Sequence, residues 1–194
     1  MLDVGCGPGT LSTRILDGLP DSIVVGVDVS DQMIEAASRN LIPRYGPRFS
    51  AYVGDFNSAD FWIPEIDREY DFIVSSIALH YLSDQRRTPF FKEVLNRLKA
   101  NGVLVACIAN RSDVGEIAEM EAFFRAEFTH QQLEKERGPQ DFEQVVRRCA
   151  EEDARANVNW CSPQEYLDSM RSAGFEKADI VWHHWLKSIF VGMK

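Results

Sequence analysis

Three glycines at alternate positions, Gly5, Gly7 and Gly9, stand between a short apolar run ending at Val4 and a helical stretch beginning at Thr10. A backbone can turn this tightly, and approach a ligand closely, where side chains are absent. The loop also leaves the N-terminus of the following helix open to a ligand. This order of strand, loop and helix predicts an α/β protein that binds a ligand at the loop.

The spacing of these glycines argues against one large class of ligand. Domains that bind nicotinamide dinucleotides place a third Gly or Ala three residues after the second glycine of their loop. Thr10 occupies that position here, and Gly9 follows the second glycine by two residues. A nicotinamide oxidoreductase is therefore a poor interpretation of the loop.

The first 110 residues alternate apolar, strand-like runs with amphipathic stretches, the pattern of a parallel sheet covered by helices. We expect strands at 1–4, 23–27, 49–53, 70–75, 102–109, 178–185 and 188–193. We expect helices at 10–19, 31–40, 84–100 and 163–173, the last capped by Ser162. The two final strands form a hairpin through residues 186–187. The predicted fold is α/β, with a doubly wound, seven-stranded, mostly parallel sheet whose last strand is antiparallel.

The segment from Asp113 to Arg155 interrupts this alternation. It holds twelve acidic and six basic side chains, and so carries −6 of the net charge of −9. Apolar residues recur in it at helical spacing, which predicts one or two helices, broken near Gly138-Pro139. Its phenylalanines and methionine must be buried against another surface. That surface is either the top edge of the sheet, making a substrate lid, which we favour, or a second subunit of a homodimer.

Two acidic residues follow the second and third predicted strands. Asp28 can accept hydrogen bonds from both hydroxyls of a ribose, and Asp55 can accept one from an adenine amino group, with Phe56 packed on the base. Open α/β sheets bind ligands at the carboxyl edge of their strands. The fourth strand runs into a polar and aromatic segment, Ser75–Leu82, at that same edge.

The motifs D-V-G-C-G-P-G (3–9), V-G-V-D (25–28), G-D-F (54–56), Y-D-F-I-V-S-S (70–76), A-L-H-Y-L (78–82) and L-K-A-N-G-V-L (98–104) together resemble class I S-adenosylmethionine-dependent methyltransferases. The resemblance covers roughly residues 1–110 by motif and the rest by element order. It implies one Rossmann-like methyltransferase domain over 1–194. Its parts would be a cofactor-binding core (1–110), a helical insert or lid (111–160), and a C-terminal helix and β-hairpin (161–194).

The resemblance also implies a role for individual residues, beginning with those around S-adenosylmethionine. These are Asp3, Gly5, Cys6, Gly7 and Gly9 at the methionine part, Ser75 and Ser76 beneath the sulfonium, Asp28 at the ribose, Val29 beside the adenine, and Asp55 and Phe56 at the adenine amino group and ring. The catalytic candidates on the substrate side are His80 and Tyr81. A histidine pKa of roughly 6.5 suits a general base. The alternative for His80 is a partly buried ring packed under the last helix.

We therefore expect transfer of a methyl group from S-adenosylmethionine to an O, N or C nucleophile of a small molecule, with S-adenosylhomocysteine as product. One alternative is another enzyme on the same scaffold, similar to carboxy-S-adenosylmethionine synthases. It ranks second because no arginine stands at an evident position for a carboxylate-bearing co-substrate. The other alternative is a non-catalytic partner protein that binds the cofactor. Such methyltransferases normally begin with one or two further helices and a longer first strand. The chain is therefore expected to be a fragment, to have a misassigned start, or to take its lid from elsewhere, for which the insert is the candidate.

The composition limits which classes of partner and which cellular location we expect for the chain. With 45% hydrophobic and 26% charged residues, the chain has the balance of a soluble globular protein. No apolar run approaches the roughly 20 residues of a membrane helix. The negative net charge argues against nucleic acid as a partner. The acid-rich insert favours neutral or cationic acceptors. The four scattered cysteines predict a cytoplasmic, reduced protein. No spacing of ligating side chains predicts a metal, since the adjacent His183 and His184 would point to opposite faces of a strand.

Overall fold

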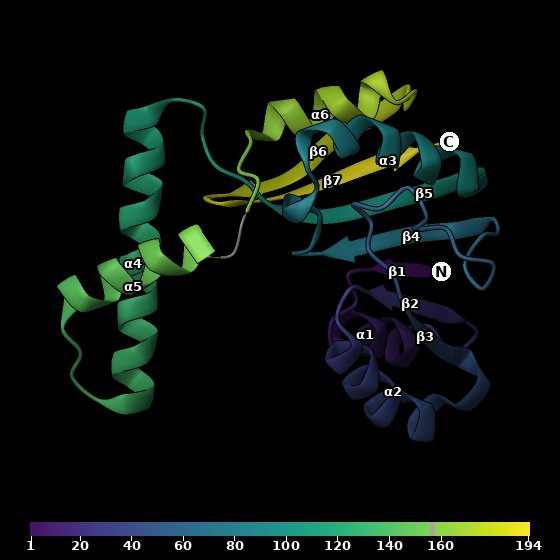
Figure 1. Cartoon of the computed structure of the whole chain (residues 1–194), viewed down its shortest axis with the longest axis horizontal. Helices are drawn as coiled ribbons and strands as arrows, with labels where there is room; N and C mark the ends of the chain where they lie inside the picture. Colours follow the sequence, from purple (N-terminus) through teal and green to yellow (C-terminus); the bar gives the residue numbers. More distant parts are fainter. Residues whose placement is uncertain (156–157) are drawn as a thin grey trace.

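The structure, a computed structural model, describes residues 1–155 and 158–194 of the chain (Figure 1). Within these residues the strands are β1 (Leu2–Val4), β2 (Val24–Asp28), β3 (Phe49–Val53), β4 (Tyr70–Ser76), β5 (Leu98–Ala109), β6 (Lys177–His184) and β7 (Lys187–Met193). The helices are α1 (Thr10–Gly18), α2 (Asp31–Tyr45), α3 (Asp84–Arg97), α4 (Gly115–Arg137), α5 (Phe142–Arg155) and α6 (Pro163–Ser172), with short 3-10 turns η1 (Gly46–Arg48) and η2 (Leu79–Tyr81).

All seven strands join one sheet in the order β3-β2-β1-β4-β5-β7-β6. Strands β1 to β5 pair in parallel, and β7 runs antiparallel to both of its neighbours. The predicted seven-stranded, mostly parallel sheet with an antiparallel last strand is confirmed. The strand order reverses between β1 and β4, and a reversal of this kind leaves a crevice at the carboxyl edge of an open sheet.

Helices cover both faces of the sheet, because adjacent residues of β2 point to opposite sides. Val24 packs in a cluster with residues of α1 and α2, whereas Val25 packs in a larger cluster with residues of α3 and α6. The α3 and α6 helices also contact each other. The two clusters pack the sheet against its helical layers, and this fixes the strand tips relative to one another.

Two predicted helix ends are wrong by more than one residue. The second helix does not end at Asn40 but continues through Pro43 to Tyr45. Its buried residues Ala37, Leu41 and Tyr45 are spaced four apart, so packing against the sheet outweighs the interruption by proline. The third helix ends at Arg97, because Leu98 takes extended dihedral angles and pairs with β4.

The C-terminal elements follow the prediction closely. Ser162 and Glu165 form a reciprocal capping box at the start of α6, with Pro163 in the first turn. Gly174, with φ 109°, follows the end of that helix. The hairpin turns at Trp185 and Leu186, one residue earlier than predicted, and Trp185 takes a left-handed φ of 51°.

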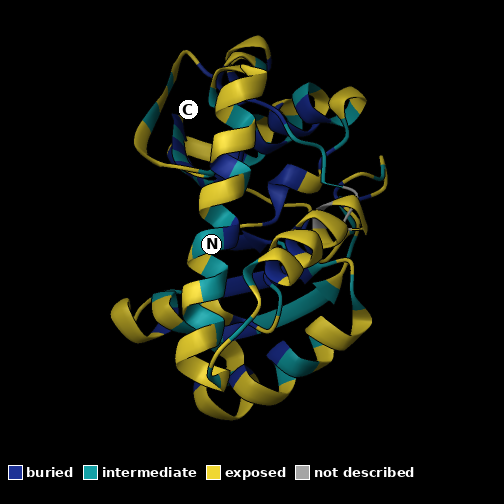
Figure 2. Cartoon of the chain, turned by 90° about the vertical axis from the view of Figure 1, so that its left-hand side faces the viewer, coloured by how far each residue is buried: buried dark blue, intermediate teal, exposed yellow. Residues whose placement is uncertain are grey.

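The acidic insert forms two helices, α4 and α5, separated at Gly138 as predicted. They pack on each other through a small cluster around Ala126, Val145 and Cys149. Figure 1 shows the pair beyond the carboxyl ends of the parallel strands, and Figure 2 shows that much of its surface is exposed. Phe124 of α4 contacts the turn of the β-hairpin, its ring centroid 4.7 Å from that of Trp185. In the described part of the chain, no helix is long and apolar enough to cross a membrane.

Candidate active site

A cavity of about 490 Å³ opens at the carboxyl edge of the sheet, where the strand order reverses. Its walls come from the loop after β1, the first turns of α1, the tips of β2 and β3, and the segment after β4. Ten of the thirteen residues singled out in the sequence line it: Asp3, Gly5, Cys6, Gly7, Asp28, Val29, Asp55, Phe56, Ser76 and Tyr81. Gly9, Ser75 and His80 lie outside this lining.

The three loop glycines have left-handed φ angles of 69°, 53° and 87°, but different neighbours require them. A Cβ on Gly5 would lie 2.2 Å from Cβ of Ala78, so packing within the protein demands a glycine there. A Cβ on Gly9 would lie 2.7 Å from Leu41 of α2. A Cβ on Gly7 would meet no atom within 4 Å. Gly7 therefore borders open space in the cavity.

Asp3 is a buried carboxylate in the middle of β1, with an exposed fraction of 1%. The hydroxyl of Ser12 in α1 donates to Asp3 Oδ2 over 2.6 Å. Burial raises the pKa of Asp3 from 3.8 to about 6, because the charged form loses its hydration. Asp3 can therefore bind a positively charged group, which would replace the stabilisation that its charge has lost with its hydration.

Asp28 is held in one orientation at the tip of β2. Its Oδ2 accepts the backbone N–H of Gly7 over 2.9 Å, and its Oδ1 accepts that of Ser30 over 3.0 Å. A carboxylate offers about four acceptor positions, so each oxygen can accept a further hydrogen bond. The side chain thus ties the glycine loop to β2 and still presents acceptors for a pair of ligand hydroxyls.

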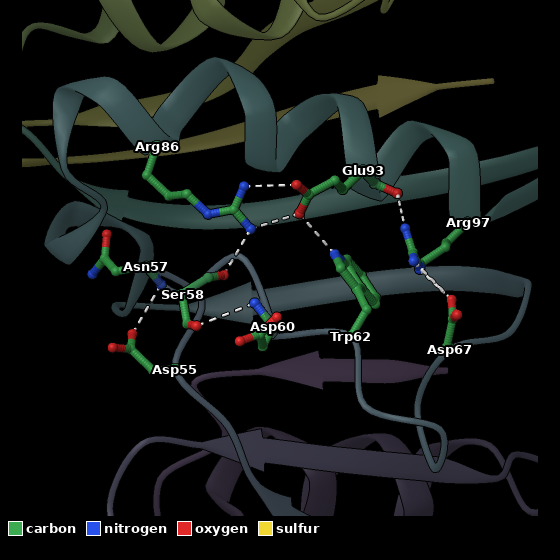
Figure 3. Close-up of polar contacts among 9 residues, drawn as sticks. All are labelled: Asp55, Asn57, Ser58, Asp60, Trp62, Asp67, Arg86, Glu93 and Arg97. Atoms are coloured by element: carbon green, nitrogen blue, oxygen red, sulfur yellow. Dashed lines mark hydrogen bonds and ion pairs between the residues drawn. The ribbon is translucent and has the colours of Figure 1, made fainter.

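The loop that carries Asp55 is anchored to α3 (Figure 3). Asp55 Oδ1 accepts the backbone N–H of Asn57 over 2.8 Å. Arg86 donates both to the carbonyl of Ser58, over 3.0 Å, and to the carboxylate of Glu93. The indole of Trp62 donates to the same carboxylate over 2.8 Å (Figure 3). This network fixes the tip of β3, so Asp55 and the neighbouring Phe56 do not depend on a ligand for their placement.

The segment after β4 holds one strained residue. Ser75 is buried, and its hydroxyl donates to the carbonyl of Val4 over 2.8 Å, whereas Ser76 faces the cavity. Ile77 then takes a φ of 54°, while its N–H donates to the carbonyl of Cys107 over 2.8 Å. A β-branched residue rarely adopts this conformation, and such strain concentrates at functional sites. The strain directs Ile77 and Ala78 to the cavity wall.

His80 is 4% exposed and packs its ring 4.2 Å from that of Tyr81, measured between centroids. Its Nδ1 has no hydrogen-bond partner in the part of the chain that the structure describes. Burial lowers its pKa from 6.5 to about 4. A histidine whose basicity burial has reduced, and which lies outside the cavity lining, is poorly suited to act as a general base. This geometry matches the alternative of a buried histidine, while Tyr81 does reach the cavity.

The sequence analysis missed Arg14, which is the one cation among the described residues that line the cavity. The sequence had offered no arginine at an evident position for a carboxylate-bearing co-substrate, and Arg14 is an arginine that the fold brings to the cavity. A signal was available, because Arg14 follows Thr10 by four residues and so lies on the same face of α1. Asn57 was missed as well. Its amide donates to the carbonyl of Tyr81 over 2.9 Å and so joins two walls of the cavity.

Comparison with known proteins gives consistent results. A family model described as a methyltransferase domain matches residues 1–102. The chain is 31% identical, over 104 residues, to a malonyl-[acyl-carrier protein] O-methyltransferase of Acetivibrio thermocellus, which covers 54% of this chain and 33% of that protein. It is 36% identical, over 83 residues, to a trans-aconitate 2-methyltransferase of Methylobacterium radiotolerans, with coverage of 43% and 28%. The chain thus spans about a third of the length of these relatives.

A solved structure, PigF with SAH, superimposes with a TM-score of 0.67 at 23% identity. The superposition covers 100% of this chain and 49% of that chain. At this identity the likeness shows a shared fold.

Proposed function

The chain belongs to the methyltransferase domain family, as a class I S-adenosylmethionine-dependent methyltransferase, and on that premise we propose that it transfers a methyl group from S-adenosylmethionine to a small molecule. The observation that carries the proposal is the cavity at the reversal of strand order, which the glycine loop lines together with Asp3 of β1 and the acids at the tips of β2 and β3. When bound, the cofactor supplies a methyl group on a sulfonium, which is already electrophilic.

The residues present fit this cofactor in size and in chemistry. A cavity of about 490 Å³ lies within the range of small-molecule sites. Asp28 offers acceptors for the two ribose hydroxyls, and Asp55 offers one for the adenine amino group. Phe56, which is 8% exposed and lines the cavity, offers an apolar face for the base. The open space at Gly7 lets the backbone approach the ligand without a side chain between them.

The contribution of the chain to the reaction is alignment and the exclusion of water. Asp28 and Asp55 are each fixed by backbone hydrogen bonds, so they hold a ligand in one orientation at little further entropic cost. Ile77 and Ala78 give the wall after β4 an apolar surface. Such a surface keeps water from competing with the methyl acceptor.

We further propose that the acceptor atom is a carboxylate oxygen of an organic acid. The two relatives are named for acceptors that carry carboxylates, a malonyl group and trans-aconitate. An ordinary carboxylic acid has a pKa of roughly 4, so its oxygen is a nucleophile at neutral pH without a base. This agrees with a cavity whose described lining includes no histidine.

The acidic insert was expected to favour neutral or cationic acceptors, but none of its described residues lines the cavity. Several of its carboxylates instead form ion pairs with arginines on exposed helix surfaces, as Glu143 does with Arg147 and Glu151 with Arg155. Exposed charges of this kind are largely screened over about 8–10 Å at physiological salt. The charge of the insert is thus a weak guide to the acceptor.

The insert remains our candidate for a lid over the acceptor. The exposed side of α4 carries Ile117, Met120, Phe124 and Phe128, which are 37–64% exposed. An apolar stripe of this kind can cover an acceptor at the carboxyl edge or bury itself in a homodimer. Measuring the molar mass by light scattering, for the native chain and for Phe128→Asp, separates these roles. A dimer that the substitution dissociates supports the homodimer, and a monomer with reduced turnover supports the lid.

A cytoplasmic location remains a prediction from the scattered cysteines.

Isothermal titration with S-adenosylhomocysteine tests the cofactor site, with Asp28→Ala as the disabled variant and NADH as the unrelated ligand. We expect binding that Asp28→Ala abolishes and no binding of NADH. Mass spectrometry of acceptor mixtures then tests the reaction, with organic acids set against phenols and amines. Methyl esters are the expected products. Formation of carboxy-S-adenosylmethionine from S-adenosylmethionine and a carboxylate-bearing co-substrate would favour the synthase alternative. Cofactor binding without any turnover would favour a non-catalytic partner.

A further inference from the structure

The 3-10 turn η2 carries Tyr81 on the wall of the cavity, and segments distant in the sequence hold this turn in place. The hydroxyl of Tyr166 in α6 donates to the carbonyl of Leu79 over 3.2 Å. Asn57 donates to the carbonyl of Tyr81 over 2.9 Å and accepts the backbone N–H of Ser83 over 2.9 Å. The position of Tyr81 therefore depends on more than its own turn.

Asn159 makes a further set of contacts with the same turn. It belongs to residues 158–162, here called the return segment, which lie between the insert and α6. Its backbone N–H donates to the carbonyl of His80 over 3.0 Å, and its side-chain amide donates to the carbonyl of Leu82 over 2.8 Å. Asn159 thus binds the residues on either side of Tyr81, although it is not itself part of the cavity lining.

The backbone of η2 decides where the ring of Tyr81 lies. The side chain of Tyr81 is 41% exposed and its ring contacts that of His80, so its own packing fixes it only in part. Leu82 is fully buried, and the amide of Asn159 also donates to Oδ1 of Asp84, the first residue of α3, over 2.8 Å. The amide therefore spans the joint between η2 and α3. A buried carbonyl that loses its donor is destabilised, so without this amide the turn would shift and Tyr81 would move with it.

We propose that Asn159 is a positioning residue for cofactor binding, which acts from outside the cavity by holding η2 and so keeping Tyr81 at the cavity wall. The inference rests on the proposed function, and it extends the cofactor site to the return segment of the insert. Coupling between two sites is reciprocal. If Asn159 strengthens cofactor binding, then an occupied cavity strengthens the hydrogen bonds of Asn159.

A double-mutant cycle tests whether Asn159 acts through Tyr81. S-adenosylhomocysteine, titrated by calorimetry without any acceptor, is the probe for the native chain, Asn159→Ala, Tyr81→Ala and the double variant. Asn110→Ala is the matched control, because that side-chain amide also donates two hydrogen bonds, but to Ile108 of β5 and Ser188 of β7. Thermal unfolding of each variant measures its loss of stability separately.

We expect Tyr81→Ala to weaken S-adenosylhomocysteine binding about ten-fold, the scale of an aromatic side chain that a ligand covers. Asn159→Ala should weaken it about four-fold, since a displaced ring keeps part of its contact. In the Tyr81→Ala background the same substitution should weaken binding by less than about two-fold, because the group that Asn159 positions is gone. Asn110→Ala should lower the unfolding temperature and keep native affinity.

Hydrogen exchange on the native chain gives a second readout, which needs no variant and which a purely structural role would not move. The backbone N–H of Asn159 reports its own contact with His80. S-adenosylhomocysteine should slow its exchange by about the same four-fold factor, and Tyr81→Ala should remove this effect. The N–H of Gly46, which donates to the carbonyl of Ile42 at the end of α2, is the control and should not change.

Three results overturn the inference while leaving the proposed function intact. They are native affinity of Asn159→Ala for S-adenosylhomocysteine, an equal loss of affinity from Asn159→Ala with and without Tyr81, and exchange at Asn159 that the ligand leaves unchanged. An equal loss of affinity in Asn110→Ala would assign the effect to general stability and overturn it as well. A native, folded chain that does not bind S-adenosylhomocysteine overturns the proposed function and this inference with it.

Discussion

Replacing Asp3 with asparagine should stabilise the chain at neutral pH. Asp3 is buried, and its pKa rises from 3.8 to about 6 on folding. An acid whose pKa is higher in the folded state contributes stability that is fully present below the unfolded pKa and is lost as pH rises through the folded pKa. A difference of about two units corresponds to about 3 kcal/mol of unfolding free energy. Above about pH 6, the ionised Asp3 therefore destabilises the fold by this amount.

Urea unfolding of the native chain and of Asp3→Asn, between about pH 4 and pH 8, measures this effect. Asparagine is neutral and its amide oxygen still accepts the Ser12 hydroxyl, so at about pH 7.5 the variant should be more stable by about 3 kcal/mol. The gap should close towards about pH 4. Taking the difference removes the contribution of His80, whose lowered pKa acts the other way. That contribution is present above about pH 6.5 and is lost as pH falls through about 4.

Glu35→Gln is the control, since Glu35 is 76% exposed and pairs with Arg39 in the same helix. We expect a change of a few tenths of a kcal/mol at every pH. A variant Asp3→Asn that is less stable than the native chain at about pH 7.5, or a gap that does not vary with pH, would refute the reasoning.

The same variant should bind S-adenosylhomocysteine at least about ten-fold more weakly by calorimetry, because the ligand ammonium loses its charged partner. Unchanged affinity would remove Asp3 from cofactor recognition.

Three further predictions follow from the site. Asp28→Asn, which keeps the shape of the side chain but not its charge, should weaken S-adenosylhomocysteine binding about ten-fold by calorimetry, and native affinity would argue against a ribose contact. Gly5→Ala should lower the unfolding free energy by about 3 kcal/mol, from left-handed strain plus the clash with Ala78, whereas Gly7→Ala should cost about 1 kcal/mol from strain alone; equal losses in urea unfolding would contradict the packing argument. Methyl transfer by His80→Asn should keep the native rate within about two-fold, and the native pH–rate profile should show no step near the ordinary histidine pKa of roughly 6.5. A step that the substitution removes would make His80 the base.

Local sequence patterns were sufficient to predict the helices and strands and most residues of the candidate site. The alternate glycines between a strand and a helix, and the acids at two strand tips, predicted which residues would gather at the carboxyl edge. Parallel strands bring their carboxyl ends together regardless of what packs around them. The capping box at Ser162 was predicted for the same reason, since its two hydrogen bonds join residues three apart in the chain.

The sequence by itself thus determined the fold class, the seven strands with an antiparallel last strand, and ten residues of the cavity wall. Tertiary structure alone decided the burial of His80, the left-handed backbone of Ile77, and the extension of α2 through Pro43. It also brought Arg14 to the cavity wall beside the acidic strand tips. Each of these depends on neighbours distant along the chain, which set solvation, strain and packing. Periodicity and spacing relate only residues that are close in the sequence, so they do not indicate which distant residues surround a side chain.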